Sequence, residues 1–319
     1  EDATPLQFSL CEINLNRIKV NYKDALSKDY FYINLKHFNT AIETFDLDKM
    51  NFEVPKNTIN GLELKLKQGL AKTANKTIPD KGSSKIPLKL QLGEIDFRKL
   101  AVDYSDENSK LSTTIALKNL LVKFDKIDLN KQFMLIKSID LSDTKGVLAL
   151  GETNKSIAKQ EKNANEPNNW EIKINKTSFK QIDFRYDDDN AIVLKKGFDY
   201  NHLNLKNLNL EVENINYNPE NISGNVNSFK AAEQSGLIVQ SFTTDFFYGK
   251  KNAYLKKLYL RTPQTLLKDE ILIGYPSIAS LTKNLGELRI TATLKKSKLG
   301  FKDVLLFVPK LSETNPFKS

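Results

Sequence analysis

The residues best suited to chemistry are an acidic run, two histidines and one cysteine. Residues 187–190 (DDDN) offer several oxygen ligands in succession, which is the kind of donor that Ca²⁺ prefers. His37 and His202 lie in strand-like segments with no serine or cysteine nucleophile motif nearby. Cys11 lies in an apolar run and has no second cysteine with which to form a disulfide. We therefore expect both histidines and Cys11 to be structural.

Motifs and charge argue against the commonest catalytic and nucleic-acid functions. The sequence lacks a GxGxxG fingerprint, a Walker-type loop, an HExxH zinc motif and a GxSxG elbow. The net charge of +9 comes mostly from scattered lysines, and only five of the 48 basic residues are arginine. Readers of nucleic acid favour arginine and cluster their charge on one face. We predict a protein that is not an enzyme, needs no cofactor or metal and binds no nucleic acid.

An internal repeat organises the chain. Eight positions, nearly all apolar, recur three times at an offset of 82 residues. The first copy is Leu6, Phe8, Leu10, Ile13, Leu15, Ile18, Val20 and Tyr22; the second is Leu88, Leu90, Leu92, Ile95, Phe97, Leu100, Val102 and Tyr104; the third is Trp170, Ile172, Ile174, Thr177, Phe179, Ile182, Phe184 and Tyr186. An acidic turn follows each tyrosine, at Asp24, at Asp106 and at 187–189. A polar turn explains all three, whereas an ion site explains one, so we predict no Ca²⁺ site.

The spacing within each copy predicts strands that bend. Apolar and polar residues alternate with period two, as in half-buried strands. Two polar residues instead of one separate Leu15 from Ile18, and the same spacing recurs between Phe97 and Leu100. One extra residue would turn the following side chains to the other face unless a bulge or bend absorbs it. The same apolar-x-x-apolar-x-apolar pattern also begins at residues 117, 136, 205, 255 and 285.

We divide the chain into repeat units at about 6–85, 86–169 and 170–250, with a divergent or truncated unit at 251–319. The Lys/Asn/Ser-rich stretches at 70–85 and 151–169 are expected to be loops between units. We also predict a hairpin turn at 249–252 and a short helix over 301–308 that ends at Pro309. No apolar run is long enough for a membrane-spanning helix. Because the chain opens on Glu1, we expect it to be part of a longer protein.

The predicted fold is mostly β, an elongated, repetitive and curved antiparallel sheet with a few short helices. Alternating strands are commonly used for a closed sandwich core. The other possibility is an open curved sheet whose concave face stays apolar and holds lipid tails. Periodicity alone does not separate the two.

The repeated strand pattern with its tyrosine–acidic turns resembles the AsmA-like/TamB envelope family, and most closely the TamB-type translocation and assembly proteins of Bacteroidetes-like bacteria. The most specific stretches are 235–239 (SGLIV), 255–263 (LKKLYLRTP) and 303–309 (DVLLFVP). The resemblance covers essentially the whole chain and rests on hydrophobic patterns, without catalytic residues.

The resemblance implies a sheet folded lengthwise into a U-shaped apolar groove, often called a β-taco. It implies a periplasmic protein tethered to the inner membrane by an N-terminal helix, which reaches toward the outer membrane and serves phospholipid transport and outer-membrane protein assembly. We expect that anchor, and the C-terminal region that would meet an outer-membrane barrel partner, to lie outside this chain.

Three functional hypotheses follow. The first is a segment of a lipid-transfer conduit that binds phospholipid acyl chains; the second is a scaffold for outer-membrane protein assembly; the third is a closed β-sandwich for adhesion or carbohydrate binding. For the conduit, the candidate lipid-contacting residues are Leu6, Phe8, Leu10, Ile13, Leu15, Ile18, Val20, Leu88, Leu90, Leu92, Ile95, Phe97, Leu100, Val102, Leu117, Leu120, Val122, Trp170, Ile172, Ile174, Phe179, Ile182, Phe184, Leu205, Leu208 and Leu210.

Overall fold

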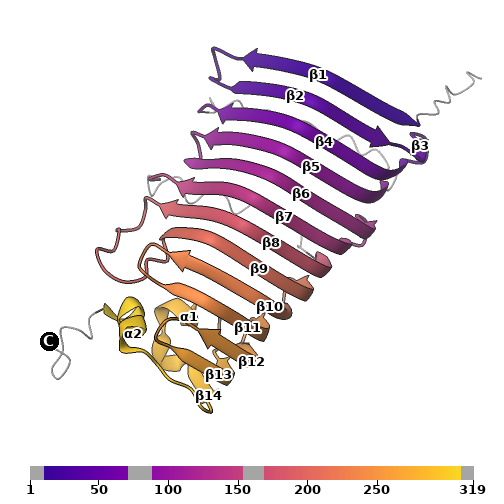
Figure 1. The fold of residues 1–319 in the computed structure, drawn as a ribbon. Helices are drawn as coiled ribbons and strands as arrows, with labels where there is room; N and C mark the ends of the chain where they lie inside the picture. The colour runs from indigo at the N-terminus through magenta and orange to yellow at the C-terminus, as the bar shows by residue number, and fades with distance from the viewer. Residues whose placement is uncertain (1–10, 71–87, 154–168, 310–319) are drawn as a thin grey trace, which may run out of the picture.

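The protein is one large curved sheet of 14 strands, drawn in Figure 1 as a stack of bent ribbons. The computed structural model describes residues 11–70, 88–153 and 169–309. The expectation of a mostly β, elongated and repetitive sheet that forms a U-shaped groove is confirmed. In the described residues the sheet has no second sheet packed against it, so the closed β-sandwich alternative is wrong.

The strands before residue 190 have 12 or 18 residues each, except for the three-residue strand Thr44–Asp46. They are β1 (Glu12–Lys23), β2 (Tyr30–Ala41), β3 (Thr44–Asp46), β4 (Asn51–Gln68), β5 (Lys89–Asp106), β6 (Leu111–Asp128), β7 (Phe133–Leu150) and β8 (Glu171–Asp188). The remaining strands are β9 (His202–Asn218), β10 (Asn221–Glu233), β11 (Ile238–Gly249), β12 (Asn252–Arg261), β13 (Leu266–Gly274) and β14 (Arg289–Thr293). The helices are α1 (Ser280–Lys283), the 3-10 helix Leu285–Glu287 and α2 (Phe301–Phe307).

Neighbouring strands follow the chain order, and β3 pairs only with β4. All pairs are antiparallel except β4 with β5 and β7 with β8, which are parallel. Parallel neighbours need a connection that returns to the starting end of the strand, unlike the tight turn of a hairpin. These two junctions are where the sequence carries its low-complexity stretches, most of which lie outside the described residues.

A row of single residues runs across the sheet where the strands bend. The strand registers skip one residue in each strand along this row, which consists of Arg17, Lys36, Gly61, Lys99, Lys118, Asp143 and Gln181. Five of the seven have left-handed backbone angles, with φ between 49° and 71°. Those five belong to β1, β4, β5, β7 and β8, which all run in the same direction, so the extra residue is absorbed alike in each.

The bend keeps apolar side chains on one face. Arg98 and Lys99 are both exposed, while the flanking Phe97 and Leu100 are shielded in part. A bulge that adds one residue restores the alternation and bends the strand. The predicted bend between Phe97 and Leu100 is therefore confirmed, with the exposed Arg98 and Lys99 at the bend.

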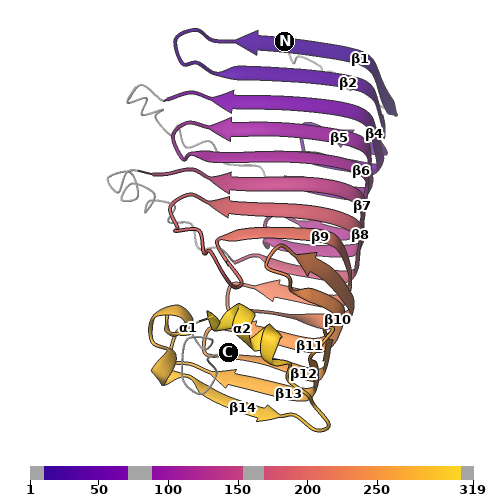
Figure 2. The ribbon, with the colours of Figure 1, turned by 60° about the vertical axis from the view of Figure 1, so that its left-hand side comes forward.

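The C-terminal end of the sheet carries the helices. Figure 2 shows α2 in front of the last strands, at the opposite end of the stack from β1. The predicted helix is confirmed at Phe301–Phe307, and the predicted hairpin turn lies between β11 and β12. The bent strand predicted to begin at residue 285 is wrong: Glu287 N–H donates to the Asn284 carbonyl at 3.0 Å and closes a 3-10 turn, so β14 begins only at Arg289.

Candidate functional site

The main candidate site is a continuous row of apolar side chains that crosses the sheet, which we call the ladder. Residues paired across adjacent strands share a face of the sheet. Following the registers from β1 to β13 links twelve residues, one from each strand except β3: Leu15, Phe38, Ile59, Phe97, Leu120, Leu141, Phe179, Leu210, Phe229, Phe242, Leu260 and Leu267. Every member is apolar. At about 4.8 Å between strands, the ladder is roughly 50 Å long.

None of the ladder side chains is buried. Eleven are half-buried and Leu15 is 39% exposed. Among the described residues, no large side chain is more than 98% buried. A second layer would shield such a row, because a continuous apolar stripe is favourable only when it is removed from water. The ladder is thus an open apolar surface and not the inside of a core.

Further rows flank the ladder on the same face. Ile18, Leu100 and Ile182 fall in the next row beyond the bend, and Val20, Val102 and Phe184 in the one after it. The row on the other side of the ladder holds Ile13, Ile95 and Val122, and also Thr177. Equivalent positions of the repeat therefore lie in the same rows.

The structure places most of the lipid-contact candidates predicted from the sequence. The ladder contains Leu15 and four more of them, namely Phe97, Leu120, Phe179 and Leu210. The rows beyond the bend contain Leu117, Leu205 and Leu208. The starts of β5 and β8 contain Leu90, Leu92, Ile172 and Ile174. Leu88 and Trp170 immediately precede those strands. Leu6, Phe8 and Leu10 lie outside the described residues.

The sequence-based candidates omit seven of the twelve ladder residues: Phe38, Ile59, Leu141, Phe229, Phe242, Leu260 and Leu267. Phe38 and Ile59 come from β2 and β4, and Phe229 and Phe242 from β10 and β11. A signal was present for the first two, since residues 35–38 and 59–62 both show the apolar-x-x-apolar spacing. The β10 register is irregular on both sides of Phe229, which hides the period.

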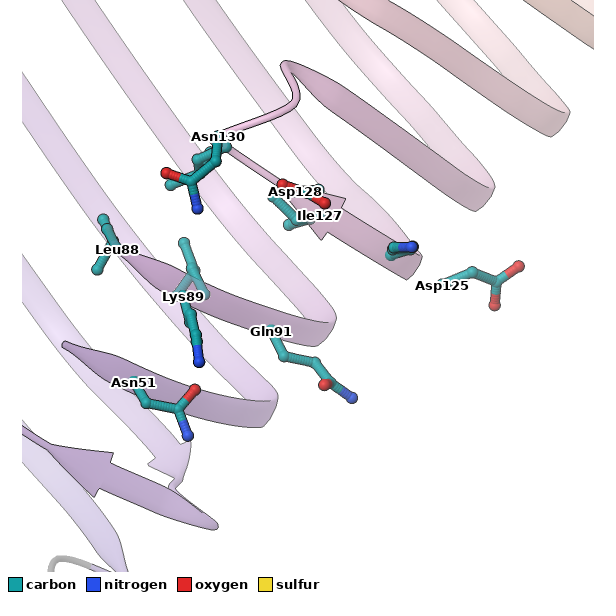
Figure 3. A pocket seen from close by; sticks show the side chains of 11 residues that line it. Asn51, Leu88, Lys89, Gln91, Asp125, Ile127, Asp128 and Asn130 are labelled. Atoms are coloured by element: carbon teal, nitrogen blue, oxygen red, sulfur yellow. The ribbon is translucent and has the colours of Figure 1, made fainter. Parts of the chain in front are cut away.

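One hollow, with both polar and apolar groups in its lining, lies at the rim where β5 begins and β6 ends. Its volume is about 580 Å³, and Figure 3 shows its lining side chains. Lys89, Gln91 and Asn51 extend from neighbouring strands, while Asp125 points away from Leu88. Without polar groups that converge on one point, this hollow has no arrangement suited to binding a small molecule.

The acidic turns after each copy use their carboxylates within the turn. Asp106 Oδ1 accepts from the Asn108 N–H at 2.8 Å, and Asp188 Oδ1 accepts from the Asn190 N–H at 3.0 Å. In the first copy, Asp24 Oδ1 accepts from the Leu26 N–H at 2.8 Å, and this bond is the chief reason that the pKa of Asp24 is lowered. Within the described ranges, no three acidic, histidine or cysteine side chains form a metal-binding group.

The two histidines are held by local partners. His37 Nδ1 lies 2.7 Å from Asn16 Oδ1, and His202 Nδ1 lies 3.0 Å from Asp199 Oδ2. Asp199 and His202 are each only 8% exposed at the side chain. Asp199 also accepts from the backbone N–H groups of Leu194 and Asn201 at 2.8 and 3.0 Å, and so fixes the β8–β9 loop.

Replacing Asp199 by asparagine tests this role. Burial opposes ionisation of Asp199, but its backbone donors and His202 outweigh that effect and lower the pKa. A carboxyl group whose pKa is lower in the folded protein than in the unfolded chain stabilises the fold at pH values above the unfolded-state pKa of about 4. This contribution disappears as the pH falls through the folded-state pKa. We expect Asp199→Asn to lower stability by about 1–2 kcal/mol at pH 7, and the deficit to shrink below pH 4. Urea midpoints across pH 3–7 measure it.

The matched control is Asp48→Asn, which alters an exposed carboxylate in the β3–β4 turn. Its midpoints should follow those of the wild type at every pH. A constant deficit for Asp199→Asn from pH 7 to pH 3 would contradict the role of the ionised carboxylate.

Comparison with protein-family models, curated proteins and solved structures finds no match. None of the short helices in the described residues has the length or the apolar character needed to cross a membrane.

Proposed function

We propose that this protein is a segment of a lipid-transfer conduit, in which acyl chains lie along the ladder. The observation that carries the proposal is the unbroken apolar row across twelve strands, none of whose members is buried. Each CH₂ group moved from water onto such a surface gains up to about 0.8 kcal/mol. An open apolar stripe of roughly 50 Å is therefore suited to a ligand made largely of methylene groups.

Uniformity of the row supports movement along it rather than tight capture. The side chains at Leu15, Phe97 and Phe179 occupy equivalent places in the three copies, so successive sites have similar chemistry. Sites of similar affinity along a path allow a ligand to leave each one as readily as it entered. The conduit needs no catalytic residue, cofactor or metal for this.

The resemblance to AsmA-like/TamB proteins extends the proposal to phospholipid transport between inner and outer membranes in the periplasm. In that setting the partners are phospholipid acyl chains, the inner membrane and an outer-membrane barrel protein.

Native mass spectrometry tests the proposal directly. Protein purified from bacteria in a gentle, lipid-free buffer should carry phospholipid, with several lipids released on activation in the gas phase. Exposure to vesicles that contain a fluorescent phospholipid should then replace the bound lipid. Protein that carries no lipid and takes none from vesicles would overturn the proposal.

The scaffold hypothesis is supported by a different observation. In the described residues β1 pairs only with β2, so one edge of β1 offers N–H and C=O groups for pairing with another strand. If the scaffold role holds, charged substitutions in the ladder leave function intact and disruption of β1 abolishes it.

A further inference from the structure

A second, smaller hollow lies at the C-terminal end of the ladder, beneath α2. It has a volume of about 320 Å³, and the last two ladder residues, Leu260 and Leu267, form part of its wall. Val304 and Phe307 of α2 face them from the other side. We call this hollow the terminal bay. Because α2 lies over the ladder here, the bay is bounded on two sides while it remains open to solvent, in contrast to the uncovered surface along the rest of the row.

The lining of the bay is apolar apart from three groups that bind one another. Asp303 Oδ2 accepts from Thr262 Oγ1 and from Thr265 Oγ1, each at 2.5 Å. The Gly300 N–H donates to Thr265 Oγ1 at 3.0 Å. Thr262 and Thr265 are 5% and 4% exposed. These bonds fix the start of α2 over the sheet and leave the bay walls without a polar group directed at a ligand.

The β8–β9 loop holds the other end of α2. Phe198 stacks on Phe307 with 5.4 Å between ring centroids, and its N–H donates to the Leu306 carbonyl at 2.6 Å. Gly197 has φ of +91°, and a Cβ there would lie 2.7 Å from the Leu306 carbonyl oxygen, so the close approach requires glycine. With both ends of α2 fixed, the bay has a preformed shape.

We propose that the terminal bay binds a single alkyl chain, as found in a free fatty acid or in one acyl chain of a lipid. Its volume is at the lower end of the range of about 300–1,000 Å³ for ligand sites, which suits one chain better than a two-chain lipid. Its walls offer only dispersion and hydrophobic contact, so the ligand is hydrocarbon. As the end of the ladder, the bay rests on the proposed conduit function: a chain that moves along the row comes to a bounded site here.

Photolabelling of the full chain with a twelve-carbon fatty acid that carries an alkyl diazirine tests the proposal. We expect saturable labelling at about one equivalent, mapped by mass spectrometry to α2 and to β12–β13. Val304→Phe fills the bay with a larger apolar group and should weaken binding at least tenfold. Lys302→Phe places the same side chain on an exposed position of the same helix and should bind like the wild type.

Circular dichroism and hydrogen exchange of the α2 amides establish that both variants keep the helix. Labelling spread evenly over the strands, or equal affinity of Val304→Phe and Lys302→Phe, would overturn the bay as a site.

A second arm uses vesicles with diazirine-labelled phospholipid to separate the two proposals. If phospholipid labels the ladder while neither ligand labels α2, the bay fails and the conduit stands. If the fatty acid labels the bay while phospholipid labels nothing, the bay stands as a fatty-acid site and the conduit fails. If the protein takes up neither ligand, both proposals fail. Phospholipid labels at α2 that compete with the fatty acid would identify lipid acyl chains as the source.

Discussion

Replacing Phe97 by glutamate should weaken phospholipid binding at least tenfold, and replacing Phe179 by glutamate as well should abolish it. Phe97 is the fourth of the twelve ladder residues and pairs with Ile59 on one side and Leu120 on the other. A carboxylate there must lose its hydration for an acyl chain to lie across it, and an unpaired charge in an apolar environment costs several kcal/mol. A second charge in β8 interrupts the row again. Native mass spectrometry and uptake of fluorescent phospholipid from vesicles measure the loss.

The control for this experiment lies on the same strand. Ala101 is exposed and alternates with Leu100 and Val102, so its side chain lies on the opposite face. Ala101→Glu adds the same charge to β5 without touching the ladder and should keep full lipid binding. Because Phe97 is only half-buried, both variants should fold, with unchanged circular dichroism. If Phe97→Glu and the double variant bind lipid as Ala101→Glu does, the conduit is contradicted and the scaffold is favoured.

Replacing Gly93 by alanine should lower the free energy of unfolding by about 2–3 kcal/mol, near the upper end of the overpacking range. A Cβ at position 93 would lie 2.3 Å from the Pro55 carbonyl oxygen and 2.9 Å from the Pro55 Cα. These atoms belong to the backbone of β4, so β4 and β5 must separate to relieve the clash. The contact lies in one of the two parallel pairs, between Val54–Leu92 and Lys56–Glu94. Urea unfolding and hydrogen exchange along β4 measure the effect.

The matched control is Gly146→Ala in β7. The nearest atom to its Cβ is Phe184 Cδ2 at 3.4 Å, an ordinary contact with a side chain. Alanine also reduces the conformational freedom of the unfolded chain, so this variant should equal or slightly exceed the wild type in stability. Equal urea midpoints for the two alanine variants would show that β4 and β5 adjust to the extra atom, which would contradict the close approach at Gly93.

Much of the strand architecture follows from local pattern. The offset of 82 residues predicts that Leu15, Phe97 and Phe179 are equivalent, and the registers place all three in the ladder. The extra polar residue in each copy predicts a bend, and Arg17, Lys99 and Gln181 have left-handed backbones at that place. Both are properties of a single strand, because alternation and its interruption decide which face each side chain occupies.

Only the tertiary structure decided whether that face is open or closed. The same alternation suits a sandwich, and nothing in the pattern around Phe97 tells whether a second layer covers it. A local period does not encode the register or contact that joins distant residues. Three examples are the parallel pairing of β4 with β5, the continuation of the ladder through Phe229 and Phe242, and the position of α2 over Leu260. Local alternation is enough to specify a repetitive, bent strand that is apolar on one side. The way in which those strands stack makes the apolar side an uncovered groove with one bounded end.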